Sequence, residues 1–93
     1  MIEVQIDLKQ AVEARHGGTA TFVKSVPVHL ARGAQTIWNG AVQVFDLTGS
    51  PTGAARCYAW SMRTPDGERK IFALLHNETV AGPREAVRAA IGV

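Results

Sequence analysis

The chain has 93 residues, of which 46% are hydrophobic and 19% are charged. This apolar fraction excludes a disordered segment, and the length suits one compact core, so we expect a single domain over residues 1–93. Ten lysines and arginines against eight aspartates and glutamates give a net charge of +2, too small an excess to indicate nucleic-acid binding by itself.

Cysteine content and hydropathy predict the cellular compartment of the protein. Cys57 is the single cysteine, which excludes an internal disulfide and a cysteine-based zinc site and favours a reducing compartment. No stretch approaches the roughly 18 consecutive apolar residues of a spanning helix, and the N-terminus lacks a basic segment followed by an apolar one. We therefore expect a soluble, cytoplasmic protein with no membrane partner.

The N-terminal segment predicts a weak strand followed by a helix. Apolar and polar residues alternate over residues 2–6, which is the period of a half-buried strand. Asp7 then offers an N-cap, and the apolar spacing over residues 8–16 predicts a helix. Gly17 and Gly18 supply a left-handed stop.

The rest of the chain predicts four strands and a second helix. The strands are expected over residues 19–30, 37–47, 55–63 and 70–77, and the helix over residues 84–91. Pro27 removes a backbone donor from the first strand and so places it at an edge of the sheet. Consecutive strands with short connections usually pair with their neighbours, so we expect an α+β fold with an antiparallel meander in the order 1-2-3-4.

The connections also predict the register. A symmetric loop after the second strand pairs Val44 with Tyr58, Val42 with Trp60 and Gly40 with Met62. A bulged turn at residues 64–68 then pairs Trp60 with Phe72 and Tyr58 with Leu74. One face of the sheet is therefore large and aromatic, and the other is small and apolar.

The second face is a candidate interface. Two short helices can cover one face of four strands but hardly both, and the aromatic face is the one on which we expect them to pack. A homodimer that closes through the other face would bury the remaining apolar surface. The interface residues are then Ile37, Ala41, Phe45, Ala59, Ile71, Ala73 and Leu75.

The predicted register also places Asp46, Arg56 and His76 side by side at one end of the aromatic face. A carboxylate, a guanidinium and an imidazole in a row could bind an anion or hold a histidine for proton transfer. The simpler interpretation, which we favour, is a cross-strand charge pair beside a solvated histidine.

Aromatic residues interleaved with basic ones suggest a second alternative. Trp38, Tyr58, Trp60 and Phe72 lie near Arg56, Arg63, Arg69 and Lys70. Such a face could stack nucleic-acid bases, although helices packed on it would hide the rings. We favour the core.

Neither a catalytic residue nor a metal or cofactor site is predicted. Cys57 and His76 point to opposite faces in the predicted register, and the three histidines share no metal-binding spacing. The sequence therefore predicts a non-enzymatic interaction module that self-associates through a sheet face or edge. The alternatives are a nucleic-acid-binding domain on the aromatic and basic face, and a ligand-binding or enzymatic domain at Asp46, Arg56 and His76.

Overall fold

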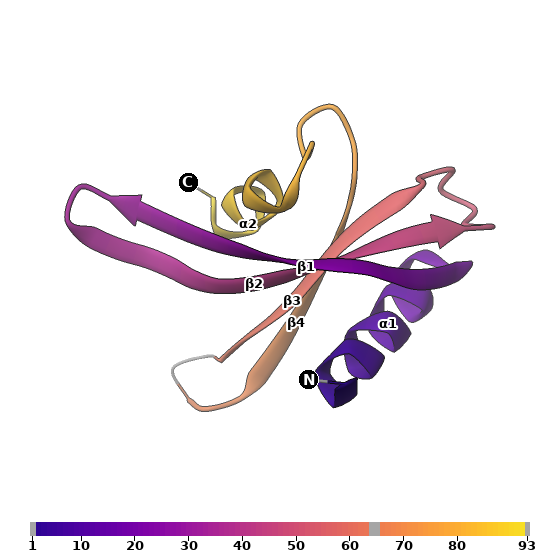
Figure 1. Ribbon diagram of the computed structural model, residues 1–93, viewed down its shortest axis with the longest axis horizontal. Helices are drawn as coiled ribbons and strands as arrows, with labels where there is room; N and C mark the ends of the chain where they lie inside the picture. Colours follow the sequence, from indigo (N-terminus) through magenta and orange to yellow (C-terminus); the bar gives the residue numbers. More distant parts are fainter. Residues whose placement is uncertain (1, 64–65, 93) are drawn as a thin grey trace.

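The computed structural model describes residues 2–63 and 66–92. In chain order, the elements are α1 (Ile2–His16), β1 (Thr19–Arg32), β2 (Gln35–Thr48), β3 (Arg56–Arg63), β4 (Arg69–Leu75) and α2 (Pro83–Ile91). The strands form one antiparallel sheet in the order β1-β2-β3-β4 (Figure 1). This arrangement confirms the predicted α+β class and the meander.

Helix α1 begins at Ile2, so the predicted strand over residues 2–6 is wrong, and Asp7 is not an N-cap. Three alternating apolar residues are a weak strand signal, whereas Leu8 and Val12 lie one turn apart on a helix and are both buried. The ion pair between Lys9 and Glu13, at 2.7 Å, supports the same helix.

The predicted end of this helix is confirmed. Gly17 has a φ of 76°, a left-handed conformation that glycine adopts without strain, and its N–H donates to the Glu13 carbonyl at 2.9 Å. The Glu13 carboxylate accepts a hydrogen bond from the Ala20 N–H at 2.9 Å and so ties the helix end to β1. Hydrogen bonding from Lys9 and then from Ala20 lowers the pKa of Glu13.

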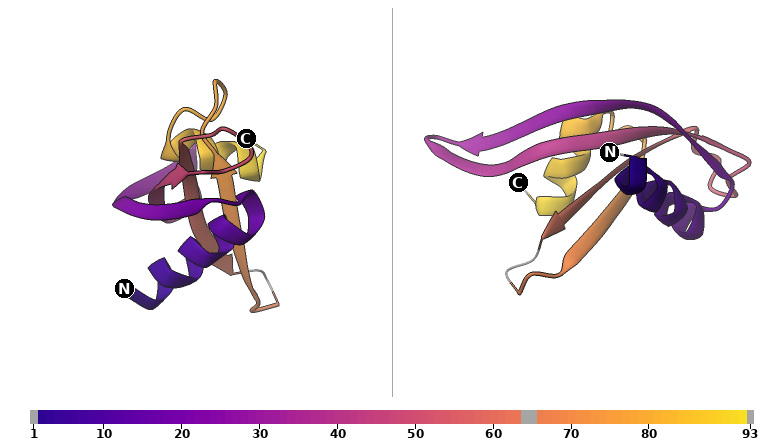
Figure 2. Two further views of the ribbon diagram at one scale, coloured as in Figure 1. Left: turned by 90° about the vertical axis from the view of Figure 1, so that its right-hand side faces the viewer. Right: turned by 60° about the horizontal axis from the view of Figure 1, so that its bottom comes forward.

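The sheet forks. β1 and β2 pair along nearly their whole length, but β2 pairs with β3 only from Gln43–Ala59 to Asp46–Arg56. Beyond this shared base, the β1–β2 hairpin arches away from the β3–β4 hairpin (Figure 2). The two hairpins are therefore joined at one end and separate at the other.

The fork decides which predicted pairs form. Val44 pairs with Tyr58, Trp60 with Phe72 and Tyr58 with Leu74, as expected. The pairs Val42–Trp60 and Gly40–Met62 lie past the end of the β2–β3 ladder and do not form. The predicted turn at residues 64–68 includes positions 64 and 65, which lie outside the described residues.

A β-bulge at Val23 changes which side chains of β1 face each side of the sheet. Phe22 pairs with Phe45, but Lys24 already pairs with Val44, so Val23 is the extra residue. Even-numbered residues before the bulge therefore face α1, and even-numbered residues after it face α2.

The helices cover opposite faces of the sheet (Figure 1). Helix α2 packs Ala86 and Val87 on the aromatic face, where Tyr58 and Trp60 are buried as predicted. Helix α1 packs on the second face, over a cluster of buried residues. That cluster is Leu8, Val12, Ala20, Phe45, Leu47, Cys57, Ala59 and Ala73.

This arrangement corrects the expectation that both helices pack on the aromatic face and leave the second face free. The expectation assumed two short helices, whereas α1 has 15 residues and reaches about 22 Å. A helix of this length can cover one face of the sheet alone, which leaves α2 to cover the other. Neither described helix has the length and apolar content needed to cross a membrane.

Candidate functional site

The predicted site residues Asp46, Arg56 and His76 do lie next to one another at the base of the sheet. Arg56 Nη2 is 3.2 Å from Asp46 Oδ1, and both side chains are exposed. The His76 N–H donates to the Arg56 carbonyl at 2.9 Å, but its ring Nδ1 shares a hydrogen bond with the Tyr58 hydroxyl at 2.8 Å. The ion pair and the imidazole therefore have separate partners, and an exposed pair of this kind contributes roughly 0.2–1 kcal/mol.

The Cys57 thiol is buried on the α1 side of the sheet. Burial raises its pKa from 9.0 to about 12, against a smaller opposing effect of Arg15. A thiol with this pKa is protonated near neutral pH and is a poor nucleophile. Within residues 2–63 and 66–92, no group of three histidine, cysteine, aspartate or glutamate side chains could hold a metal ion.

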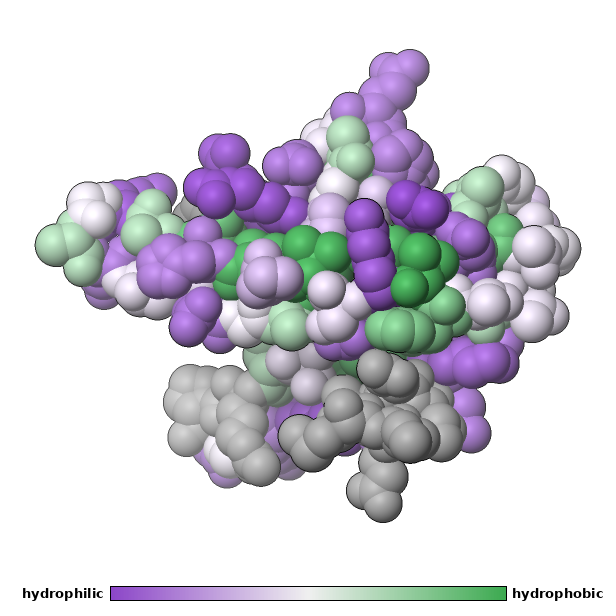
Figure 3. Space-filling model, viewed as in Figure 1, coloured by the Kyte–Doolittle hydropathy of each residue, from purple (hydrophilic) through white to green (hydrophobic). Residues whose placement is uncertain are grey.

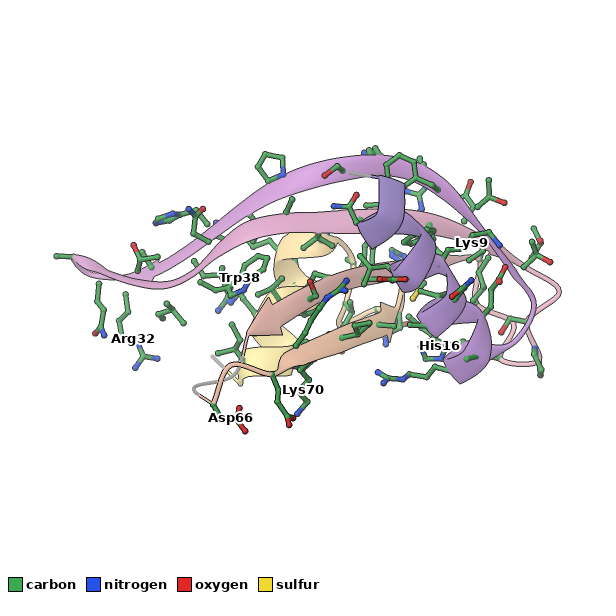
Figure 4. All side chains as sticks on the ribbon, turned by 90° about the horizontal axis from the view of Figure 1, so that it is seen from below. Lys9, His16, Arg32, Trp38, Asp66 and Lys70 are labelled. Atoms are coloured by element: carbon green, nitrogen blue, oxygen red, sulfur yellow. The ribbon has the colours of Figure 1, made fainter. Side chains whose placement is uncertain are left out.

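The aromatic residues of the second alternative form core contacts. The Trp60 and Phe72 rings stack with centroids 5.4 Å apart, and the Trp38 ring lies 6.3 Å from Trp60. Figure 4 shows Trp38 pointing from β2 toward β3. Lys70 Nζ sits 5.4 Å from the centroid of the Phe72 ring. Trp38 and Phe72 are half-buried, so little aromatic surface is left for base stacking.

The predicted interface residues are divided by α1. Phe45, Ala59 and Ala73 are buried beneath the helix, so the expectation that they are open to a partner is wrong. Ile71 and Leu75 are half-buried against the same cluster. Ile37 is half-buried on the α2 side, and Ala41 alone of the seven is exposed.

Side chains also form hydrogen bonds with backbone groups of both edge strands, β1 and β4. On β1, Glu13 binds the Ala20 N–H, and the Arg84 guanidinium donates to the His29 carbonyl at 3.4 Å. On β4, the His16 ring donates to the Ala73 carbonyl at 2.9 Å. Such contacts occupy backbone groups that could otherwise pair with another chain.

A cleft of about 240 Å³ lies between the distal end of β1 and helix α2. Its lining is Leu30, Ala31, Arg32, Ile37, Arg84 and Arg88. Half of these residues are arginines and the other half are apolar, so the lining contributed by residues 2–63 and 66–92 has no acidic side chain. Figure 4 shows Arg32 at the far end of the β1–β2 hairpin.

Two elements position the three arginines. Arg32 is the last residue of β1, directly before the turn at Gly33. Pro83 begins α2, and Arg84 and Arg88 follow at a spacing of one helical turn on an exposed face. The Arg84 guanidinium also makes a long hydrogen bond of 3.4 Å to the His29 carbonyl of β1.

The charges on α2 have mixed effects on the stability of the helix. Glu85 in the first turn and Arg88 in the last turn suit the helix dipole. Arg84 stands in the first turn, where the dipole disfavours a cation, and like charges one turn apart destabilise a helix by about 0.2–0.5 kcal/mol. Favourable and unfavourable charges are therefore both present on this short helix.

The cleft has the chemistry of an anion site. A guanidinium group stays charged at any physiological pH and presents paired N–H donors that match carboxylate and phosphate oxygens. Across the described part of the chain, Arg32 and Arg88 have no carboxylate within salt-bridge distance. Glu85 lines a neighbouring cleft on the other side of Arg88.

The sequence contains one signal for this site. The spacing of Arg84 and Arg88 places two cations on one face of a predicted helix. The contribution of Arg32 depends on tertiary packing and has no local signature.

In comparisons with known proteins, no family model matches the chain, and no curated protein or solved structure is detectably similar to it.

Proposed function

We propose that this protein is a binding module and not an enzyme, and that the cleft formed by Arg32, Arg84 and Arg88 binds an anionic group of its partner. The observation that carries the proposal is that three arginines from two elements line one cleft, whose described lining includes no acidic residue. Opposite charge at such a site favours association and orients the ligand.

The placement of the titratable groups supports binding over catalysis. Arginine neither takes up nor releases a proton near neutral pH, so the cleft itself offers no general acid or base. The buried Cys57 thiol and the His76 ring, which is bonded to Tyr58, lie at the shared base of the sheet and are not part of the cleft lining.

An NMR titration tests the proposal. Sodium sulfate is added at constant ionic strength, and the arginine Nε–H signals are followed. We expect saturable shifts at Arg32, Arg84 and Arg88 and only small shifts at Arg56 and Arg69, which pair with Asp46 and Asp7. Equal shifts at all surface arginines would overturn the proposal, because they would show general ionic screening.

A matched pair of double variants provides the control. Arg32→Gln with Arg88→Gln removes two charges from the cleft, and both side chains are exposed, so the fold should be retained. Arg56→Gln with Arg69→Gln removes two charges elsewhere. We expect the first variant to lose sulfate binding and the second to keep it; the reverse result would place the site outside the cleft.

Self-association is a second candidate function. The observation in its favour is the exposure of Phe22 and Val23, which are 39% and 40% exposed on β1. Figure 3 shows hydrophobic residues gathered over the central part of the β1–β2 hairpin and bordered by hydrophilic ones. Pro27 and Ala41 add small exposed residues to this hairpin. The oligomeric state tests this candidate.

A further inference from the structure

The charge, size and lining of the cleft narrow the class of anion. We infer that the ligand is a small phosphomonoester, bound as its dianion, with the phosphate held by Arg32, Arg84 and Arg88. This inference rests on the proposed function, because it specifies which anion the same cleft selects.

The charge balance favours a dianion. A carboxylate and a phosphodiester each carry one negative charge, whereas a phosphomonoester carries nearly two at neutral pH and has three terminal oxygens. Three guanidinium groups offer more paired donors than a carboxylate can accept. The monoester therefore uses more of the positive charge and of the donors in the cleft.

The size and lining of the cleft favour a small ligand. Its volume of about 240 Å³ is below the roughly 300–1,000 Å³ of pockets for drug-sized molecules. A phosphate group fills only part of this space. Leu30, Ala31 and Ile37 form the apolar part of the lining and suit a short carbon skeleton attached to the phosphate.

The surroundings disfavour a nucleic-acid strand. Strand binding combines a continuous basic track with exposed rings on which bases stack. Here Tyr58 and Trp60 are buried beneath α2, and Arg69 is paired with Asp7 at 3.2 Å. Outside the cleft, Arg15, Lys24 and Lys70 lie on three different elements, α1, β1 and β4.

Calorimetric titration separates the monoester from other anions. The probes are glycerol 3-phosphate, dimethyl phosphate and acetate, each at about pH 7.5 and at matched ionic strength. We expect glycerol 3-phosphate to bind about tenfold more tightly than either monoanion. Equal binding of the three would overturn the inference but leave the proposed function standing, whereas no binding of any probe would overturn both.

A change of pH tests the dianion directly. The second pKa of a phosphomonoester is about 6, so lowering the pH from about 7.5 to about 5 should weaken glycerol 3-phosphate binding by about tenfold. The charged groups near the cleft are the three arginines, His29 on β1 and Glu85 on α2. Sulfate keeps its charge over this range and corrects for their titration. If binding of the two anions changes in parallel, the dianion inference is wrong.

Variants and larger ligands complete the test. Arg32→Gln with Arg88→Gln should abolish glycerol 3-phosphate binding, whereas Arg56→Gln with Arg69→Gln should not; the opposite outcome places the phosphate elsewhere. A phosphoserine heptapeptide and vesicles that contain a phosphoinositide carry the same group on larger bodies. If either binds more tightly than glycerol 3-phosphate, the ligand is not a small molecule.

Discussion

Trp60 lies at the centre of the face that α2 covers, with 1% of its surface exposed. It stacks on Phe72 and also contacts Trp38. Replacing a buried aromatic residue by alanine removes its apolar contacts and leaves a cavity. We expect Trp60→Ala to lower the free energy of unfolding by about 3–5 kcal/mol in a urea titration, and Trp38→Ala to lower it less. An unchanged melting temperature together with a loss of oligonucleotide binding would instead support the base-stacking alternative.

Cys57 makes stability depend on pH in the alkaline range. Its pKa is about 12 in the folded protein and about 9 when the thiol is solvated, so folding favours the protonated form. This contribution is fully present below about pH 9 and is lost as the pH rises toward 12, by up to about 1.4 kcal/mol per pH unit. Burial also raises the pKa of Tyr58, and this acts in the same direction.

The variant Cys57→Ala isolates the thiol. We expect the unfolding free energy of the wild type to fall more steeply than that of Cys57→Ala between about pH 9 and about pH 11, as measured by urea titration. Tyr58 is present in both proteins and cancels in the comparison. Parallel pH profiles would show that the thiol is solvated in the folded state.

Ala59 and Ala41 test the position of α1 on the sheet. Both point to the same side of the sheet, but Ala59 is fully buried beneath α1 and Ala41 is exposed on the distal part of β2. We expect Ala59→Glu to destabilise the fold by more than about 3 kcal/mol, because it buries an unpaired charge. Ala41→Glu should change stability by no more than about 0.5 kcal/mol. A folded Ala59→Glu variant would show that α1 is not held against this face.

At the scale of the elements, strands and turns were easier to predict than the helix faces. The strand bounds differ from the prediction by only a few residues, because Gly33, Pro51 and Gly67 mark the connections between them. The start of α1 was misplaced because alternation over residues 2–6 competes with a helical spacing that becomes visible only from Leu8 onward. Alternation shows which residues share a face, but not which helix covers that face.

The bulge at Val23 could not be predicted from the phase of the β-branched residues. Thr19, Thr21 and Val23 stand at odd positions, and Val26 and Val28 stand at even ones. The three odd-numbered residues are exposed, however, and the buried residue before the bulge is Ala20, whose small side chain gives no phase signal. The extra residue at Val23 lets Ala20 pack on the α1 side and Val28 on the α2 side of the same strand.

Deleting Val23 tests this interpretation. Without the extra residue, either the segment around Ala20 or the segment around Val28 must turn to the wrong face. We expect the deletion to lower the midpoint of urea unfolding strongly. Val23→Ala keeps the chain length and should have a small effect, because Val23 is 40% exposed. Similar stability of the two variants would show that the bulge is not needed for the two-sided core.

The candidate cleft could be predicted from the sequence only in part. Arg84 and Arg88 share a face of a helix that was correctly predicted, but the third arginine approaches them only because the hairpin carries Arg32 to α2. The predicted neighbours Asp46, Arg56 and His76 did come together, because their positions depend on strand register alone. Strand register is set by short loops, which can be recognised in the sequence. The cleft, in contrast, forms only when α2 packs beside β1.

At the scale of the whole molecule, the two helices give each face of a forked sheet its own cover. The molecule extends over 42 × 30 × 21 Å, and its long axis follows the β1–β2 hairpin (Figure 1). The base of the sheet carries α1 and its cluster, whereas the distal part of β1 carries the cleft beside α2. The outer side of the distal hairpin, which includes Ala41, remains accessible.

Self-association remains a prediction, and the structure restricts where it can occur. Beneath α1 the second face is closed, and Glu13, His16 and Arg84 occupy backbone groups at the sheet edges. The exposed residues Phe22 and Ala41 therefore mark the surface through which two copies would meet.

Light scattering after size exclusion, at high micromolar concentration, provides the test. We expect the wild type to have twice the chain mass of 10.0 kDa, and Ala41→Glu to return to the single-chain mass because it places like charges opposite each other across a two-fold interface. Gln10→Glu adds the same negative charge at an exposed position on α1 and serves as the control, which should remain dimeric. A wild type at the single-chain mass would contradict self-association, and a dimer that tolerates Ala41→Glu would place the interface elsewhere.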